Sequence, residues 1–163
     1  MARCLIVGCG CRGLALAREL HLRGHRVRGT TRDPARATQL EAANVEPVVG
    51  DPDRIASLSQ ALAHTGVACL LLGSAAGGDE AIRALHGPRL AMLLERTIDT
   101  TVRGVVYEAT GTVDPEVLRS GAELVKRACR RSSIGFELLS ADPRDHAGWP
   151  ALAADAVERV LLG

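Results

Sequence analysis

The most specific chemical pattern in the sequence lies near its amino terminus. Gly8-Cys9-Gly10-Cys11-Arg12-Gly13 has the spacing G-x-G-x-x-G. In such a loop the first glycine permits a tight turn, the second lets the main chain approach a pyrophosphate, and the third allows a helix to pack closely on a strand. The pattern indicates a phosphate-binding site when a strand precedes the loop and a helix follows it, because the helix then offers free N–H groups to phosphates. A turn without a ligand is the alternative. No G-K-[ST] follows, which excludes a phosphate-hydrolysing P-loop.

The residues after the second apolar segment bear on which dinucleotide would fit. A site for NAD normally carries Asp or Glu there to bind the ribose hydroxyls. This chain has Gly29-Thr30-Thr31-Arg32 instead, where Arg32 can hold a 2′-phosphate and Thr30 or Thr31 can donate a hydroxyl. Asp33 could supply the acid, although Asp33-Pro34 fits a helix start better. The pattern favours NADP(H), with NAD as the alternative and a solvated Arg32 as the plainer interpretation.

Two more loops follow apolar segments and could face the same ligand. Asp51, in Gly50-Asp51-Pro52, could contact an adenine amino group or simply begin a turn. Gly73-Ser74-Ala75 has small side chains that would let a ribose lie against the main chain, or it is a flexible loop. We expect both at the carboxyl ends of strands, where ligands of open α/β sheets bind.

The cysteines suggest redox or metal chemistry that their spacing does not favour. Cys9 and Cys11 lie in the glycine loop, but the chain has no C-x-x-C and no histidine near the pair, so no metal site is predicted. A helix amino terminus lowers thiol pKa values, so Cys11 could be reactive, whereas apolar filling is the plainer interpretation. Five cysteines without a secretory leader predict a cytoplasmic protein.

Size and composition narrow the class of protein. The 163 residues predict a single domain over residues 1–163. A net charge of +1 and an aromatic content of 2% disfavour nucleic acid as a partner. No apolar run approaches the roughly 20 residues that a membrane span needs. The expected partners are therefore a dinucleotide and an unknown small-molecule substrate.

The elements that would position these loops alternate regularly along the chain. Apolar runs predict strands at 3–7, 25–30, 45–49, 67–72, 104–109 and 136–140. Amphipathic stretches and caps predict helices at 14–22, 33–43, 53–63, 79–99 with a break near Gly87-Pro88, 114–131 and 149–162. Because no hairpin turn joins the strands, parallel pairing through right-handed crossovers is expected. The predicted fold is an α/β, doubly wound, parallel six-stranded sheet with helices on both faces.

Four segments resemble the extended and atypical short-chain dehydrogenase/reductase superfamily, and its NAD-dependent epimerase/dehydratase-like members most closely. These are VGCGCRG, GHRVRGTTR, the GDP after the third strand, and RGVVYEATGTV at the fifth. The resemblance covers nearly the whole chain and implies a Rossmann sheet. It implies that Gly8, Gly10, Arg12 and Gly13 line a pyrophosphate, Thr31 and Arg32 a 2′-phosphate, Asp51 an adenine, and residues 73–75 a ribose. Thr110 matches the family's catalytic Ser/Thr.

The chain departs from this family at the proton-transfer pair Tyr-x-x-x-Lys. Tyr107 and Lys126 are the only residues of their types, and Ala122 stands four positions before Lys126. The chain also leaves no room for the substrate lobe of extended members. It is expected to be an oxidoreductase without this pair, or a non-catalytic dinucleotide sensor or partner-binding module. The amino-terminal half of a hydroxyacid-dehydrogenase-like enzyme is a third interpretation. Relatives often pair through helices that match 79–99 and 114–131, which predicts a homodimer.

The sequence also predicts the surroundings of three further polar residues. Glu108 should be a carboxylate paired with an arginine or lying near the nicotinamide, His86 should be solvated, and His146 should lie on the rim of the site.

Overall fold

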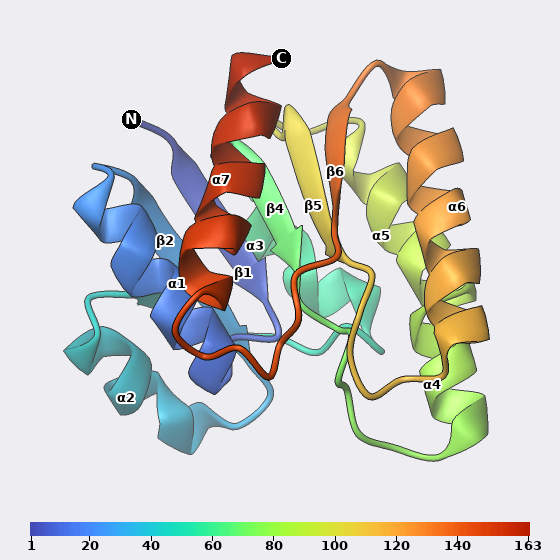
Figure 1. Ribbon diagram of the computed structural model, residues 1–163, viewed down its shortest axis with the longest axis horizontal. Helices are drawn as coiled ribbons and strands as arrows, with labels where there is room; N and C mark the ends of the chain where they lie inside the picture. The colour runs from blue at the N-terminus through green and yellow to red at the C-terminus, as the bar shows by residue number, and fades with distance from the viewer.

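The computed structural model describes residues 1–163 and contains a single six-stranded sheet (Figure 1). Every neighbouring pair is parallel, in the order β3-β2-β1-β4-β5-β6. The strands are β1 (Arg3–Val7), β2 (Arg26–Thr31), β3 (Glu46–Val49), β4 (Val67–Leu70), β5 (Gly104–Glu108) and β6 (Gly135–Leu139). The predicted doubly wound α/β sheet is confirmed.

The chain also forms seven α-helices and two 3₁₀ turns, all of which lie between strands except the last helix. The α-helices are α1 (Cys11–Leu22), α2 (Ala37–Ala42), α3 (Ser59–Leu62), α4 (Asp79–Leu85), α5 (Pro88–Thr97), α6 (Pro115–Ser132) and α7 (Trp149–Leu162), and the 3₁₀ turns are η1 (Pro34–Arg36) and η2 (Ile55–Leu58). None of the helices combines the length and apolar character needed to cross a membrane.

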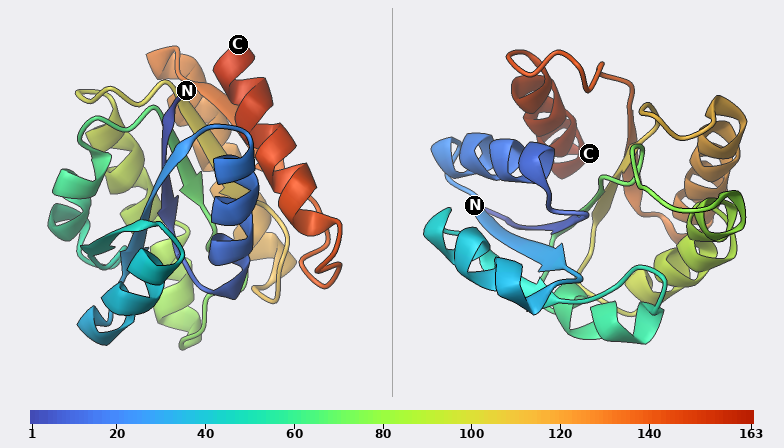
Figure 2. Two further views of the ribbon diagram at one scale, coloured as in Figure 1. Left: turned by 90° about the vertical axis from the view of Figure 1, so that its left-hand side faces the viewer. Right: turned by 90° about the horizontal axis from the view of Figure 1, so that it is seen from below.

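The sheet separates two apolar cores, with helices on both of its faces (Figure 2). Side chains alternate along β1, so Cys4 and Ile6 enter the core under α1 and α7, whereas Leu5 and Val7 enter the core under α5 and α6. All four are fully buried. A strand covered on both faces needs a continuous apolar run, which is why β1 could be recognised in the sequence.

Helix boundaries differ from expectation mainly after β2 and β3. The predicted helix 33–43 begins as the 3₁₀ turn η1, and the predicted helix 53–63 is η2 followed by a single turn, α3. The stretch 79–99 divides into α4 and α5, and Pro88 begins the second of them. A proline is tolerated there because the first helical N–H has no intrahelical acceptor.

Candidate functional site

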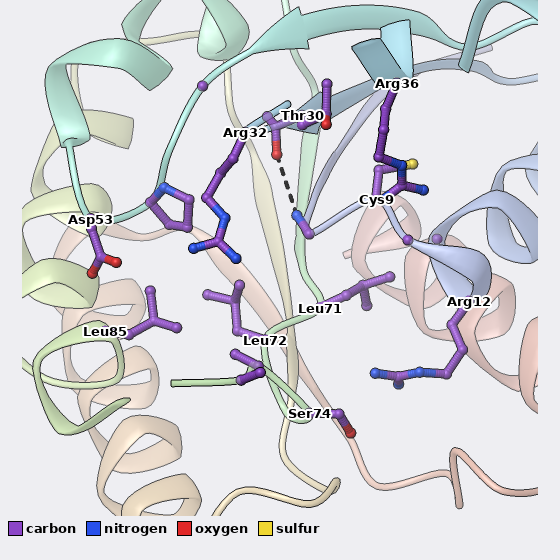
Figure 3. Close-up of a pocket in the computed structure, with 18 of the residues that line it drawn as sticks. Cys9, Arg12, Thr30, Arg32, Arg36, Asp53, Leu71, Leu72, Ser74 and Leu85 are labelled. Carbon is purple, nitrogen blue, oxygen red and sulfur yellow. Dashed lines mark hydrogen bonds between the residues drawn. The ribbon is translucent and has the colours of Figure 1, made fainter. Parts of the chain in front are cut away.

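A cavity of about 370 Å³ opens at the carboxyl ends of the first four strands (Figure 3). Its lining comes from the β1–α1 loop, the end of β2, the loops after β3 and β4, and one face of α4. The residues are Gly8, Cys9, Gly10, Cys11, Arg12, Gly13, Thr30, Thr31, Arg32, Arg36, Gly50, Pro52, Asp53, Leu71, Leu72, Ser74, Ala75, Ala76, Ala81, Ile82 and Leu85. The glycine loop and the end of β2, both predicted from sequence, therefore meet at one cavity.

The glycine loop is held tightly against its neighbours. Gly8 has a φ of +83°, and a Cβ atom there would lie 2.6 Å from the carbonyl oxygen of Leu71. Only glycine suits that backbone and that space. The Gly8 N–H donates to the Thr30 hydroxyl at 3.3 Å (Figure 3), which ties the loop to β2. A Cβ at Gly10, by contrast, would meet open space.

The beginning of α1 offers hydrogen-bond donors to this cavity. No side chain caps the helix at Gly10, and no acidic residue lies in its first turn. The N–H groups of a first turn have no intrahelical acceptor, and the helix dipole places partial positive charge there. An anion is the ligand that this arrangement favours.

The end of β2 carries cations and no free carboxylate. Arg32 and Arg36 both line the cavity, while Asp33 uses its carboxylate to cap η1 at the Ala35 N–H, 2.9 Å away. The Thr31 hydroxyl donates to the Asp33 carbonyl at 3.1 Å, and Thr30 holds Gly8. The threonines are thus buried and bonded within the protein, and the two arginines are the side chains with free donors.

Arg36 was not foreseen in the sequence. It lies in the turn η1, and the close-up places it beside Cys9 (Figure 3). The helix start at Asp33-Pro34 could have indicated that Arg36 lies near Arg32, because it makes the chain turn back directly after Arg32.

Two residues predicted to contact a nucleotide lie outside the cavity lining. The Asp51 carboxylate accepts the Asp53 N–H at 2.9 Å, which is the turn-forming role considered for it, and Asp53 reaches the cavity instead. Gly73 donates its N–H to the Glu108 carboxylate at 2.8 Å, while its neighbours Ser74 and Ala75 line the cavity.

Thr110 lies beyond the end of β5 and outside the cavity lining as well. Its hydroxyl donates to the carbonyl oxygen of Ala141 at 3.2 Å, which connects the β5–α6 loop to the segment after β6.

Arg12 lines the cavity but directs its guanidinium elsewhere. It forms an ion pair with Glu108 at the end of β5 and lies 5.3 Å from the centre of the Trp149 ring. Glu108 is fully buried, and the second carboxylate oxygen accepts from Arg12 at 3.2 Å. Burial lowers the pKa of Arg12. The expected pairing of Glu108 with an arginine is what the structure contains.

The remaining candidates for acid–base chemistry are bonded to other residues of the chain. His86 is 1% exposed, so the expectation that it is solvated was wrong. It lies where α4 meets α5 and bonds the Tyr107 hydroxyl at 2.7 Å and the Leu72 carbonyl at 3.0 Å. Burial raises the pKa of Tyr107, and Lys126 pairs with Glu123 on α6. Tyr107 and Lys126 therefore have separate partners.

Comparison with known proteins agrees with this geometry. A family model described as NAD(P)H-binding matches residues 8–134. The chain belongs to this family. The match begins at Gly8 and includes the glycine loop, the two arginines and both loops after β3 and β4. No curated protein matches the sequence.

Solved structures with the same fold are short-chain dehydrogenase/reductase and epimerase/dehydratase-like Rossmann proteins. A short-chain dehydrogenase/reductase superfamily protein of Agrobacterium tumefaciens with bound NAD is 20% identical, with a TM-score of 0.67 over 83% of this chain and 48% of that one. Triphenylmethane reductase of Citrobacter sp., complexed with NADP(H), is 19% identical, with a TM-score of 0.62 over 84% and 48%. A protein of Bacillus halodurans described as an NAD-dependent epimerase/dehydratase is 20% identical, with a TM-score of 0.68 over 83% and 68%.

This member of the NAD(P)H-binding family spans about half the length of the first two of these structures. At such identities the likeness concerns the fold.

Proposed function

We propose that this chain binds NADP(H) in the cavity at the carboxyl ends of β1 to β4. The observation that carries the proposal is the pair Arg32 and Arg36, which line the cavity where a site for NAD would carry an acidic residue. A guanidinium binds a phosphate through a charge-assisted fork of two N–H donors. The only acidic side chain in the lining, Asp53, comes from the loop after β3.

The other lining residues suit the remaining parts of the cofactor's adenosine half. The open space at Gly10 and the uncapped start of α1 would receive the pyrophosphate. Ser74 and Ala75 would lie against the ribose, with Asp51 and Gly73 shaping the loops that support them. Residues 1–163 would then act as one NAD(P)-binding Rossmann domain.

The test is a calorimetric titration with NADPH and with NADH. We expect Arg32→Ala and Arg36→Ala each to weaken NADPH binding about 10- to 100-fold, the range that follows from losing a hydrogen bond to a charged group. NADH affinity should change little. Arg18→Ala, an exposed arginine of α1 outside the cavity, is the matched control. Equal losses for both cofactors would refute the 2′-phosphate assignment and favour NAD.

A second candidate function, a non-catalytic dinucleotide sensor, has its own support. Tyr107 and Lys126 each bond a different partner, and Thr110 donates its hydroxyl to Ala141. Proton transfer to a carbonyl would need a positioned acid within hydrogen-bond reach. The chain is therefore better suited to binding the dinucleotide than to reducing a substrate with it.

Turnover separates the two functions. NADPH absorbance is followed with a panel of aldehydes, ketones and quinones, and a sensor should bind NADPH without oxidising it. Oxidation that Thr110→Ala abolishes, with NADPH affinity retained, would instead support an oxidoreductase in which Thr110 orients the substrate.

We also propose a homodimer in a reducing, cytoplasmic environment. All five cysteines are free, as such a compartment requires. The apolar stripes of α5 and α6 are mostly buried within the chain, but Met92 and Ile98 remain 43% and 52% exposed. Sedimentation equilibrium should find a dimer that Ile98→Asp dissociates, and a monomeric wild-type protein would refute it.

A further inference from the structure

The cavity crosses the point where the strand order reverses, between β1 and β4, but extends no further than the loop after β4 and α4. Its lining residues all lie between Gly8 and Leu85, and none comes from β5, α6, β6 or α7. A Rossmann sheet consists of two mononucleotide-binding halves, and a dinucleotide extends across both of them. The first half and the segment after β4 line the cavity here, whereas the ends of β5 and β6 contribute nothing to it.

Three interactions connect the end of β5 and the loop after it to the elements around the cavity. The Gly73 carbonyl accepts the Val113 N–H at 3.0 Å, and the Ser74 hydroxyl accepts the Thr112 N–H at 3.2 Å, so the loops after β4 and β5 are joined. A Cβ at Gly73 would overlap the Thr110 carbonyl oxygen, which shows how closely these loops approach.

The third interaction, the Arg12–Glu108 ion pair, crosses from the start of α1 to the end of β5. In the close-up the Arg12 side chain extends away from Arg36, on the side of Leu71 and Ser74 (Figure 3). Its guanidinium reaches Glu108 and the ring of Trp149, a residue that is 1% exposed. Arg12 therefore lines the cavity and also reaches the end of β5.

We propose that the Arg12–Glu108 ion pair closes the nicotinamide half of this site. The closed protein then takes 2′-phosphorylated adenosine nucleotides through their adenosine half and admits the nicotinamide half only when the pair opens. This inference rests on the proposed function. The pair can open because the nicotinamide-side phosphate of the pyrophosphate, which adenosine 2′,5′-bisphosphate lacks, offers Arg12 an alternative anion. The exchange replaces one charge-assisted bond by another.

The closed pair should reduce the affinity for the whole cofactor and leave the adenosine half unaffected. Binding that requires a minor conformation is weakened by the fraction of molecules in it, so an open fraction of about one tenth weakens binding about tenfold. Adenosine 2′,5′-bisphosphate, which has no nicotinamide, needs no opening. NADP⁺ should therefore gain little affinity over this smaller nucleotide in the wild-type protein.

Glu108→Gln tests the pair with the smallest change of shape. The amide oxygen can still accept the Gly73 N–H, but the charge that holds Arg12 is gone. We expect the NADP⁺ affinity, relative to adenosine 2′,5′-bisphosphate, to rise about tenfold. Glu19→Gln removes one of the two carboxylate partners of Arg23, outside the cavity, and should leave the ratio unchanged. An unchanged ratio in Glu108→Gln would overturn the inference.

A measurement on the wild-type protein does not depend on the variant folding. Trp149 is the only tryptophan and lies beneath Arg12, so its emission reports the position of that guanidinium. Saturating NADP⁺ should change the emission, whereas saturating adenosine 2′,5′-bisphosphate should not, and identical spectra would contradict the proposal. If neither compound binds, the proposed function fails and this inference with it. If both bind and neither readout changes, only this inference fails.

Discussion

The two cysteines of the glycine loop differ in chemistry although one residue separates them. Cys9 is 2% exposed, and burial raises the pKa of its thiol to about 11. Cys11 is exposed and lines the cavity, where it begins α1. Because the thiolate is the reactive form, Cys9 should be inert at neutral pH while reagents can reach Cys11.

Alkylation tests this difference. Iodoacetamide should modify one thiol of the folded protein, Cys11, within the time that the other four stay unmodified, as measured by mass spectrometry of the peptides. Adenosine 2′,5′-bisphosphate should slow the reaction, because it would cover the same loop. Cys11→Ser should show no rapid labelling, and fast labelling of Cys9 would contradict the burial argument.

His86 should make stability depend on pH. Burial lowers its pKa below the ordinary value of 6.5, so the unfolded chain binds the proton more readily than the folded one. The contribution of neutral His86 to the free energy of unfolding is therefore present above pH 6.5 and is lost as the pH falls below that value. The Leu72 carbonyl requires a donor at Nε2, so Nδ1 accepts from Tyr107, and protonation would remove that acceptor.

Chemical denaturation between pH 5 and pH 8 gives the measurement. The free energy of unfolding should fall less steeply toward low pH in His86→Gln than in the wild type. His146→Gln, at an exposed position after β6, is the control and should keep the wild-type slope. Parallel curves for the wild type and His86→Gln would show that another group causes the dependence.

At the scale of elements, the turn between β1 and α1 depends on the close approach of Gly8 to the loop after β4. Gly8 and Gly24 share this left-handed backbone and differ in surroundings. Gly8 has a φ of +83° with Leu71 close by, whereas Gly24, after α1, has a φ of +87° and no neighbouring atom within 4 Å of the place a Cβ would take. Substitutions at Gly8 and at Gly24 therefore separate the free-energy cost of the left-handed backbone from the cost of the contact with Leu71.

Gly24→Ala should cost about 1 to 2 kcal/mol, the penalty of a left-handed backbone for an ordinary residue. Gly8→Ala should cost more than that, and it should also weaken NADPH binding because the loop must shift from Leu71. Thermal unfolding and calorimetric titration of both variants give the comparison. Equal stabilities for the two variants, with NADPH affinity intact in both, would contradict the role given to the contact between Gly8 and Leu71.

At the scale of the whole molecule, β1 joins the two cores. Leu5 and Ile6 are adjacent and fully buried, yet they pack on opposite faces of the sheet. Trp149 belongs to the core of Ile6. A substitution that destabilises the other core should therefore change the unfolding curve followed by Trp149 emission only if both cores unfold together.

Leu5→Ala should destabilise the protein by about 2 to 5 kcal/mol, as truncation of a buried leucine does. Tryptophan emission and far-ultraviolet circular dichroism should still follow one common denaturation curve. Leu22→Ala, at a residue that is 78% exposed, should change stability little. Separate transitions for the two probes would show that the cores unfold independently.

The sequence by itself determined the parallel, doubly wound character of the sheet and the place of the glycine loop. Continuous apolar runs identify strands that are covered on both faces, and G-x-G-x-x-G between such a strand and a helix has few uses. Local rules also identified the break at Pro88 and the cap at Asp33, because caps and prolines act on their own neighbours. Local reasoning also drew attention to Arg32, since this residue directly follows β2.

Only the tertiary structure decided which side chains face the cavity and which are engaged elsewhere. Arg12 reaches Glu108 across 96 positions of sequence, and His86 is buried against Tyr107 from a different element. Such contacts depend on how separate crossovers come together at one edge of the sheet, and no local pattern records that. Side-chain partners distant in sequence are set by the packing of the whole chain, whereas turns and caps are set within a few residues.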